Sequence, residues 1–423
     1  MSIRLNRRHF IAAVTSSIAA LPAMSYSRVL GANETVRLGI MGMSRGKDLA
    51  GSFAKVSGAF IATVCDVDQK RLATAATAVE KLAGKPLGIT GDFRNILDDK
   101  SVDALVCSAP NFWHAPASIL ACTAGKHVYV EKPCSHTPQE GVLLVAAARK
   151  HQRKVQMGNQ RRSYAVFREA MTALRDGLIG HVTLAKCWYG ADSKSIGTGK
   201  PTAVPAHLDY ELWQGPVERK PYQDNVVHYN WHWFWHWGNG ELGNNGVHMI
   251  DLCRWGLGVT YPSLVTSSGG RYHFQDDQQT PDTHIVTFDF PSKQSIVWEG
   301  LSCINHHPEN NADAVFHGDK GTLVLRSGGY VVLDTKGKEI RKVPGPTGDV
   351  PHVTNFIHAI RENTALNSEI EEGHLSTLLC HLGNIAHRTT HAILCDPATG
   401  QPTDATPRSL WTKSYASGWE PRV

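Results

Sequence analysis

The sequence lacks any hydrophobic run long enough to span a membrane. Its uncharged, mostly apolar stretch from Phe10 to Tyr26 is shorter than the roughly 20 apolar residues that a span needs. CxxC pairs, internal repeats, low-complexity segments and runs of lysine and arginine are also absent. The net charge of +5 comes largely from four arginines that precede Glu34, the first acidic residue. These absences argue against a stable membrane span and against a nucleic-acid partner.

Cysteine is scarce and scattered. The nine cysteines are odd in number, and several lie in apolar runs such as Ala104-Leu105-Val106-Cys107. This pattern predicts buried free thiols rather than a disulfide framework.

The N-terminus has the layout of an export signal. Asn6-Arg7-Arg8-His9-Phe10-Ile11 precedes the short apolar stretch, and small residues follow it. Paired arginines before a phenylalanine favour the twin-arginine route, with a Sec signal or an uncleaved anchor as the alternatives. That route carries folded proteins, so a cofactor could be loaded in the cytoplasm. We therefore expect the twin-arginine export machinery as a partner, and a periplasmic or exported location.

The length of 423 residues and a hydrophobic content of 42% suit two folded domains. We expect a signal peptide over 1–32, a dinucleotide-binding domain over 33–156 and a substrate-binding and oligomerisation domain over 157–423.

The first half predicts a parallel sheet covered by helices. Strand-like runs occupy 36–41, 59–64, 102–108 and 127–130, and helical patterns lie between them. Alternation of strand and helix is typical of an α/β fold with a Rossmann sheet. Gly42-Met43-Ser44-Arg45-Gly46 after the first strand would place a pyrophosphate at a helix N-terminus. Asp66, after the second strand, would accept hydrogen bonds from ribose hydroxyls and repel a 2′-phosphate, which favours NAD over NADP.

This glycine fingerprint is imperfect. Gly39, Gly42 and Gly46 are present, but Ser44 occupies the place of the second glycine of G-x-G-x-x-G. The alternative is a βα fold with a tight turn and no nucleotide.

Two later segments follow the third and fourth strands, at the sheet edge where open α/β sheets bind ligands. They are Ser108-Ala-Pro-Asn-Phe-Trp-His114 and Glu131-Lys132-Pro133. With the glycine turn and Gly246-Val-His-Met-Ile-Asp251, they resemble the Gfo/Idh/MocA oxidoreductases from about Val36 to Arg388. The resemblance implies a Rossmann domain followed by an α/β domain with a large, open, mostly antiparallel sheet. Strand-like runs between 181 and 333 agree with it. The open sheet could also pair with another subunit.

The turn and the motifs together give the residues expected to contact the dinucleotide. These are Gly39, Gly42, Met43, Ser44, Arg45, Gly46, Asp66, Ser108, Ala109, Pro110, Asn111, His114, Glu131 and Lys132.

Lys132 and His248 are the candidates for proton chemistry. Oxidation of a hydroxyl requires removal of its proton, and a lysine in a dry cleft has a lowered pKa that suits a base. The resemblance assigns Lys132 to this site. The family usually has an aspartate four residues before His248, but here Asn244 stands there and cannot ionise. We expect Asn244 to orient the substrate or His248, with Glu241 or Asp251 as possible substitutes for the missing carboxylate.

The segment His228-Tyr-Asn-Trp-His-Trp-Phe-Trp-His-Trp237 carries four of the eleven tryptophans at alternate positions. Period two predicts that all four share one face of an extended strand or loop, where indoles can stack on sugars. The alternative is a packing or interface stripe. We expect Arg161, Trp233, Trp235, His236, Asn244 and His248 to contact the substrate. His228, His232 and His236 are spaced for a helical metal site, but the alternation argues against a helix, and we predict no metal.

Three functions remain open. The first is an exported NAD(P)-dependent oxidoreductase acting on a sugar, polyol or glycoside, with a tightly bound and recycled cofactor. The second is a redox-neutral NAD-dependent glycoside hydrolase or lyase of the same fold. The third is a non-catalytic sugar-binding protein.

Overall fold

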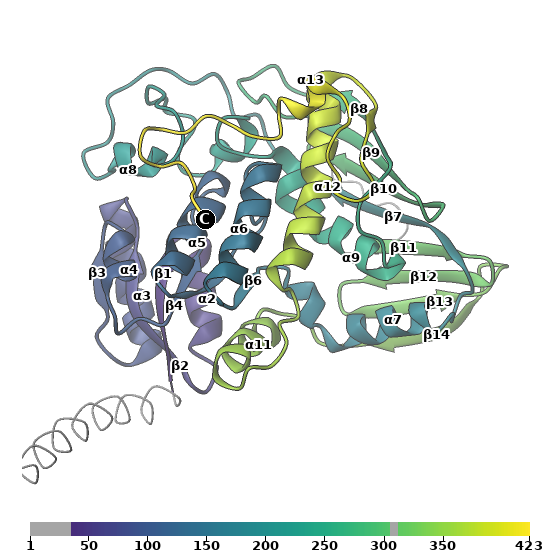
Figure 1. The fold of residues 1–423 in the computed structure, drawn as a ribbon, viewed down its shortest axis with the longest axis horizontal. Coiled ribbons are helices and arrows are strands. Elements are labelled where there is room, and N and C mark those ends of the chain that lie inside the picture. Colours follow the sequence, from purple (N-terminus) through teal and green to yellow (C-terminus); the bar gives the residue numbers. More distant parts are fainter. Residues whose placement is uncertain (1–34, 305–311) are drawn as a thin grey trace, which may run out of the picture.

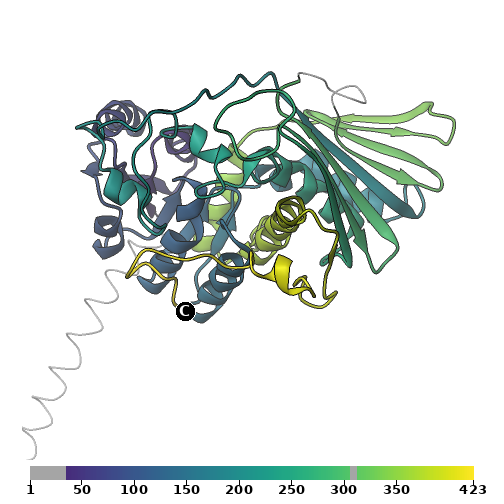
Figure 2. The same ribbon diagram turned by 90° about the horizontal axis from the view of Figure 1, so that it is seen from above.

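The computed structural model describes residues 35–304 and 312–423. The predicted export segment 1–32 lies outside the described residues. The described chain contains two sheets with helices between them, and the second sheet forms one side of the molecule (Figures 1 and 2).

The first sheet is a parallel Rossmann sheet with strand order β3-β2-β1-β4-β5-β6. Its strands are β1 Val36–Met41, β2 Ala59–Cys65, β3 Gly88–Thr90, β4 Ala104–Cys107, β5 His127–Val130 and β6 Val155–Met157. The helices are α2 Arg45–Phe53, α3 Gln69–Ala83, α4 Arg94–Asp98, α5 Asn111–Thr123 and α6 Pro138–Lys150. The strand order reverses between β1 and β4, which opens a crevice at the carboxyl ends of the strands.

Local signals explain where these helices begin and end. The Asp68 side chain accepts a hydrogen bond from the backbone N–H of Arg71, and Gly84 ends α3 in the left-handed conformation. Thr137 and Glu140 form a capping box at the start of α6. β6 ends at Met157, one residue beyond the predicted domain boundary at 156.

The second sheet has nine strands in the order β14-β13-β12-β11-β7-β10-β9-β8-β15. Its strands are β7 Val182–Gly190, β8 Leu264–Gly270, β9 Thr283–Phe290, β10 Gln294–Leu301, β11 Ala312–Gly318, β12 Gly321–Arg326, β13 Gly329–Leu333, β14 Glu339–Pro344 and β15 Ile393–Leu394. β7 and β10 pair in parallel, and the other pairs are antiparallel. The predicted fold class is therefore confirmed.

Helices cover one face of this sheet. α7 Ala165–Arg175, α9 Val247–Leu257 and α12 Ile370–Thr389 pack on it, and α12 runs between the two sheets (Figure 2). α11 Val350–Arg361 packs against α2 of the Rossmann domain instead. The expected pairing of subunits through the second sheet stays a prediction.

A long insert, residues 191–238, joins the two parts. It carries the short helices α8 Tyr210–Gln214 and η2 Asn230–Trp233, and α8 lies beside the Rossmann sheet (Figure 1). The Trp113 indole donates to the carbonyl of Trp213 at 2.9 Å. The insert therefore reaches from the second domain over the crevice of the first.

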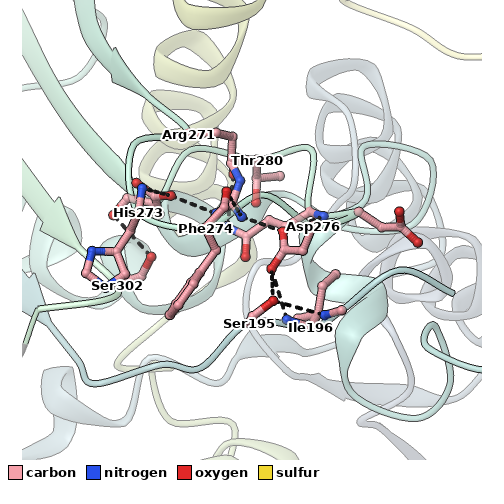
Figure 3. Close-up of polar contacts among 12 residues, drawn as sticks. Ser195, Ile196, Arg271, His273, Phe274, Asp276, Thr280 and Ser302 are labelled. Atoms are coloured by element: carbon pink, nitrogen blue, oxygen red, sulfur yellow. Dashed lines mark hydrogen bonds and ion pairs between the residues drawn. The ribbon is translucent and has the colours of Figure 1, made fainter.

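A buried ion cluster anchors the other end of the insert (Figure 3). Arg271 pairs with Asp282 at 2.8 Å and with Asp276 at 2.5 Å. Asp276 also accepts hydrogen bonds from the hydroxyl of Ser195 and the backbone N–H of Ile196, at 2.8 and 3.0 Å. Because both carboxylates are nearly fully buried, their pairing with Arg271 fixes the start of the insert against the second sheet.

The C-terminal tail returns to the Rossmann domain (Figure 1). Trp419 packs edge-on against Trp113 with ring centres 5.0 Å apart, and Lys413 pairs with Glu140 of α6 at 2.8 Å. The tail therefore belongs structurally to both domains.

All nine cysteine thiols are buried and unpaired, as predicted. Within the described ranges, no helix has the length and apolar character of a transmembrane segment.

Candidate functional site

A cleft of about 360 Å³ lies at the carboxyl ends of β1, β2, β4 and β5. The glycine turn, the segment after β4, Glu131 and Lys132 form one side, and the insert and the start of α9 form the other. The two family motifs and the end of the second strand therefore meet in one place.

The glycine turn is built for close backbone approach. Gly42 has φ +87°, and a Cβ on it would lie 2.7 Å from the carbonyl oxygen of Ser108. A Cβ on Gly46 would lie 2.7 Å from the Ser108 hydroxyl oxygen. Ser44 precedes α2, faces solvent and makes no capping hydrogen bond, so it leaves the first-turn N–H groups of α2 available to an anion. Ser44 is therefore compatible with a pyrophosphate at this turn.

Gly39 has a different role from the one predicted. It lies inside β1, where an added Cβ would be 2.2 Å from Ile96. It does not line the cleft, so its small size serves helix–strand packing rather than cofactor contact.

Asp66 is fixed at the ribose end of the cleft. Its two carboxylate oxygens accept hydrogen bonds from the backbone N–H groups of Met43 and Asp68, at 2.8 and 2.9 Å. His228 from the insert contacts Asp68 at 2.9 Å and lines the same end, together with Arg71. The insert therefore closes over the place where an adenosine ribose would sit.

The polar side chains in the segment after β4 form hydrogen bonds within the walls of the cleft. The Ser108 hydroxyl lies 2.8 Å from the carbonyl of Gly42, and Asn111 donates to Asn239 at 3.1 Å. The ring nitrogens of His114 lie 2.6 and 2.7 Å from the carbonyls of Pro133 and Ala109. The segment from Ser108 to Asn111 lines the cleft, as does His114, and the polar atoms of Asn111 and His114 are hydrogen-bonded within the protein.

Glu131 lines the cleft and also forms an ion pair with Arg45. Arg45 pairs with Glu131 at 3.1 Å and with Asp349, at the start of α11, at 2.7 Å. Glu131 is buried, so this pair ties the phosphate-binding turn to the strand end that carries Lys132. Asp349 had no recognisable signal in the sequence because it is distant along the chain.

Lys132 meets Asn244 across the cleft. Its ammonium donates to the backbone carbonyl and to the side-chain Oδ1 of Asn244, both at 2.9 Å. Asn244 lies in the π-helical turn η3 Leu242–Gly246, which leads directly into α9. Burial lowers the pKa of Lys132, while the charges of Glu131 and Glu241 oppose that shift.

His248 lies one turn further on and lines the same part of the cleft. Its Nδ1 is buried and has no hydrogen-bond partner. Burial holds the pKa of His248 well below its usual value, and the nearby cations, chiefly Lys132, add to the effect. His248 is therefore a neutral imidazole with a free nitrogen beside Lys132.

The two carboxylates considered as substitutes for the missing aspartate have different surroundings in the structure. Asp251 is fully engaged in the core by Arg162 at 2.9 Å and by the Ser376 hydroxyl at 2.6 Å. Glu241 accepts a hydrogen bond from Asn245 at 2.5 Å, and its Oε1 lies 3.5 Å from Nδ2 of Asn244. Of these two carboxylates, only Glu241 acts on the charge of Lys132, in addition to Glu131.

Arg161 does not line the cleft. Its guanidinium lies 3.5 Å from Asp313 and contacts Met249, while the neighbouring Gln160 faces the cleft. Gln160 therefore lines the cleft in place of Arg161, and a substrate contact at Arg161 is not supported by this geometry.

The prediction that the tryptophan segment is extended is wrong. Asn230–Trp233 forms a 3₁₀ helix, whose period of three turns alternate side chains to different sides. Trp231 lines the cleft and stacks on His232 with ring centres 3.6 Å apart, whereas Trp233 is buried. Trp235 and His236 line a separate cavity of about 440 Å³, with Arg388 over the Trp235 ring. No cluster of three metal-ligating side chains occurs in 35–304 and 312–423.

Tyr229 is a cleft residue that the sequence did not reveal. Its side chain lies beside Asn244 and lines the cleft, and the residue is 60% exposed. It follows His228 directly, and nothing in its sequence pattern distinguishes it from the aromatic residues nearby.

A Rossmann crevice, with a lysine at the end of β5 and a neutral histidine on the facing helix, is the arrangement of a two-domain, dinucleotide-binding protein. The family comparison agrees over nearly the whole described chain. Residues 36–159 match "Oxidoreductase family, NAD-binding Rossmann fold", and residues 181–415 match "Oxidoreductase family, C-terminal alpha/beta domain". The chain therefore belongs to the Gfo/Idh/MocA oxidoreductase family, and its first domain is an NAD-binding Rossmann domain.

Relatives within the family carry a hydrolase name. The chain is 30% identical over 385 residues to "Glycosyl hydrolase family 109 protein 2" of Shewanella sp. (strain ANA-3), covering 80% of each chain. It is 35% identical over 172 residues to a glycosyl hydrolase family 109 protein of Saccharopolyspora erythraea, covering 39% of this chain and only 37% of that relative. A solved levoglucosan dehydrogenase in complex with NADH and levoglucosan has the same fold, with a TM-score of 0.66, 20% identity, and coverage of 85% of this chain and 99% of that chain.

Proposed function

We propose that this protein is an NAD-dependent enzyme that oxidises a hydroxyl-bearing carbon of a sugar, polyol or glycoside. The observation that carries the proposal is the convergence of Lys132, Asn244 and His248 at one end of a cleft whose other end holds Asp66. When bound, the nicotinamide would supply the acceptor for a hydride. The rest of the chemistry falls to side chains of this chain.

The cleft provides the hydrogen-bonding groups that a dinucleotide requires. The glycine turn leaves backbone N–H groups free for a pyrophosphate, and Asp66 offers oxygens to ribose hydroxyls. A carboxylate there would repel a 2′-phosphate, which supports NAD over NADP. Arg71 at the same end of the cleft is the feature that would favour NADP.

Lys132 is the base or the electrostatic partner for the substrate oxygen. Burial lowers its pKa, so that the neutral amine is accessible closer to neutral pH. Asn244 holds the amine in place through two acceptors. The free nitrogen of His248 and the hydroxyl of Tyr229 are available to orient a polyhydroxylated substrate.

A redox-neutral glycosidase is the second candidate, and the hydrolase name of the Shewanella relative favours it. Oxidation of a hydroxyl to a ketone makes the neighbouring C–H acidic. Loss of that proton with departure of the glycosidic group leaves an unsaturated ketone. Addition of water to its double bond, followed by return of the hydride to the ketone, would complete the hydrolysis and leave the cofactor unchanged. The same cleft would serve both reactions.

Paired assays on free sugars and on nitrophenyl glycosides distinguish the two. The proposed oxidoreductase reduces its bound nicotinamide when a sugar is added, by up to one equivalent per chain, and releases no nitrophenol. Nitrophenol release without net reduction of nicotinamide would favour the glycosidase instead. If neither product forms across hexoses, inositols and their glycosides, the enzymatic proposal fails.

We further propose export by the twin-arginine route, with the cofactor bound before export and recycled within each turnover. Arg7 and Arg8 support this proposal. Replacement of both by lysine should retain the full-length chain in the cytoplasm. Unchanged export of that variant would contradict the route.

A further inference from the structure

A buried carboxyl group lies behind the contact between Lys132 and Asn244. Glu241 is 5% exposed and lies just before the π-helical turn η3, outside the lining of the cleft. The groups closest to its Oε1 are side-chain amides: Nδ2 of Asn245 at 2.5 Å and Nδ2 of Asn244 at 3.5 Å. Burial of a carboxyl group costs free energy unless the group is paired or hydrogen-bonded. Glu241 lies against two amides and near the ammonium of Lys132, so its burial points to a role at this site.

The first consequence concerns the orientation of Asn244. A side-chain amide has one acceptor end and one donor end. Because Nδ2 of Asn244 faces Glu241, its Oδ1 faces Lys132, 2.9 Å from the ammonium. The reverse orientation would place the amide N–H₂ against the ammonium and the amide oxygen against the carboxylate. Glu241 therefore holds Asn244 in the orientation that accepts from Lys132.

The second consequence concerns charge. The titratable groups that face Glu241 are Lys132 after β5, Tyr189 at the end of β7 and Tyr229 in the insert. Burial raises the pKa of both tyrosines, so they are neutral near pH 7. Burial also raises the pKa of Glu241, to about 7, and the charge of its ionised form stabilises the ammonium of Lys132. Lys132 is thus the cation that responds to Glu241. The other charged groups that face Lys132 are Glu131, which supports its ammonium, and Arg45, which opposes it.

We propose that Glu241 is a positioning residue that sets the protonation of Lys132 through Asn244. It does so from one helical turn before Asn244, where the family resemblance leads one to expect a carboxylate on residue 244 itself. The catalytic meaning of this inference rests on the proposed function, but its first test needs neither substrate nor turnover.

The test measures the protonation of Lys132 directly. Trace labelling with acetic anhydride across a pH series, followed by peptide mass spectrometry, gives the midpoint at which the Lys132 amine becomes reactive. Glu241→Gln removes the negative charge and should lower this midpoint by roughly one pH unit or more. Glu218→Gln makes the same change in a carboxylate that lines the separate cavity, and should leave the midpoint in place.

Two further variants separate charge from packing. Asn245→Ala keeps Glu241 but removes the amide that stabilises its ionised form, so the midpoint should fall in the same direction by a smaller amount. Glu241→Gln combined with Asn244→Asp places a carboxylate directly on Lys132, and should return the midpoint to the wild-type value or above it. A merely structural role for Glu241 predicts no such rescue. Asn245→Ala also keeps the inference testable if Glu241→Gln fails to fold.

An unchanged Lys132 midpoint in both Glu241→Gln and Asn245→Ala would overturn the inference, as would an equal shift in Glu218→Gln. With a substrate in hand, the acid limb of the rate of hydride transfer should move with the midpoint. If the midpoint shifts as expected but the wild-type protein transfers no hydride, then the proposed function fails while the role of Glu241 stands.

Discussion

Replacing Lys132 by methionine should reduce hydride transfer about a hundred- to ten-thousandfold while the protein keeps its nucleotide. Methionine is similar in length and removes both the base and the charge. The Lys132 amine makes its two hydrogen bonds to Asn244, so nothing on the Rossmann side of the cleft loses a partner. The measurement is the single-turnover rate of nicotinamide reduction, beside the nucleotide content of the purified protein.

Lys220→Met is the matched control for this substitution. Lys220 is exposed and lines the separate cavity, so the same change there should leave both the rate and the nucleotide content unchanged. A Lys132→Met protein with more than a tenth of the wild-type rate would remove Lys132 from the proton chemistry. In that case the neutral His248 and the hydroxyl of Tyr229 would be the candidates that remain.

Substituting Gly42 by alanine should lower the nucleotide content at least tenfold. The residue has φ +87°, and the new Cβ would lie 2.7 Å from the carbonyl of Ser108, closer than a carbon and an oxygen can approach. Relief of this contact requires the turn to move away from the segment after β4, which separates two walls of the proposed pyrophosphate site. The measurement is the nucleotide released from equal amounts of purified, folded protein.

Gly84→Ala is the control that isolates the contact from backbone strain. Gly84 also has a positive φ, +65°, but nothing lies within 4 Å of the position of its Cβ. This change should cost about 1 kcal/mol of stability and leave the nucleotide content intact. Equal loss of nucleotide in both variants would mean that general destabilisation, and not the shape of the turn, controls binding.

The sequence predicted the cleft where the signals are local. Asp66, Lys132 and the segment after β4 follow buried strands, and the carboxyl ends of parallel strands meet at one edge of a sheet. Asn244 and His248 lie one helical turn apart, so they were expected to act together. Those residues meet in the structure because the strand order and the helical period place them along the same cleft.

The rest depended on contacts between distant parts of the chain. Arg162 neutralises Asp251, so that of the two candidates to replace the missing aspartate only Glu241 acts on Lys132, which no local pattern could decide. The alternation of tryptophans suggested a strand, but Asn230–Trp233 forms a 3₁₀ helix that is followed by turns. Burial of Trp231, Trp233 and Trp237 overrode the two-residue period.

Short strands escaped prediction for a simpler reason. β3 and β6 have three residues each, and β15 has two, which is too short for a periodic pattern. β14 is a polar edge strand, Glu339–Pro344, and it lacks the alternation of buried and exposed residues on which strand prediction depends.

The most direct test of the account is to identify the nucleotide that the protein carries. The mature protein is purified without added nucleotide and denatured, and the released small molecules are identified by absorbance and mass. The account predicts NAD(H), close to one per chain. NADP(H) in its place would contradict the role given to Asp66. No nucleotide, with no binding when NAD is added back, would contradict the enzymatic account and favour a non-catalytic sugar-binding protein.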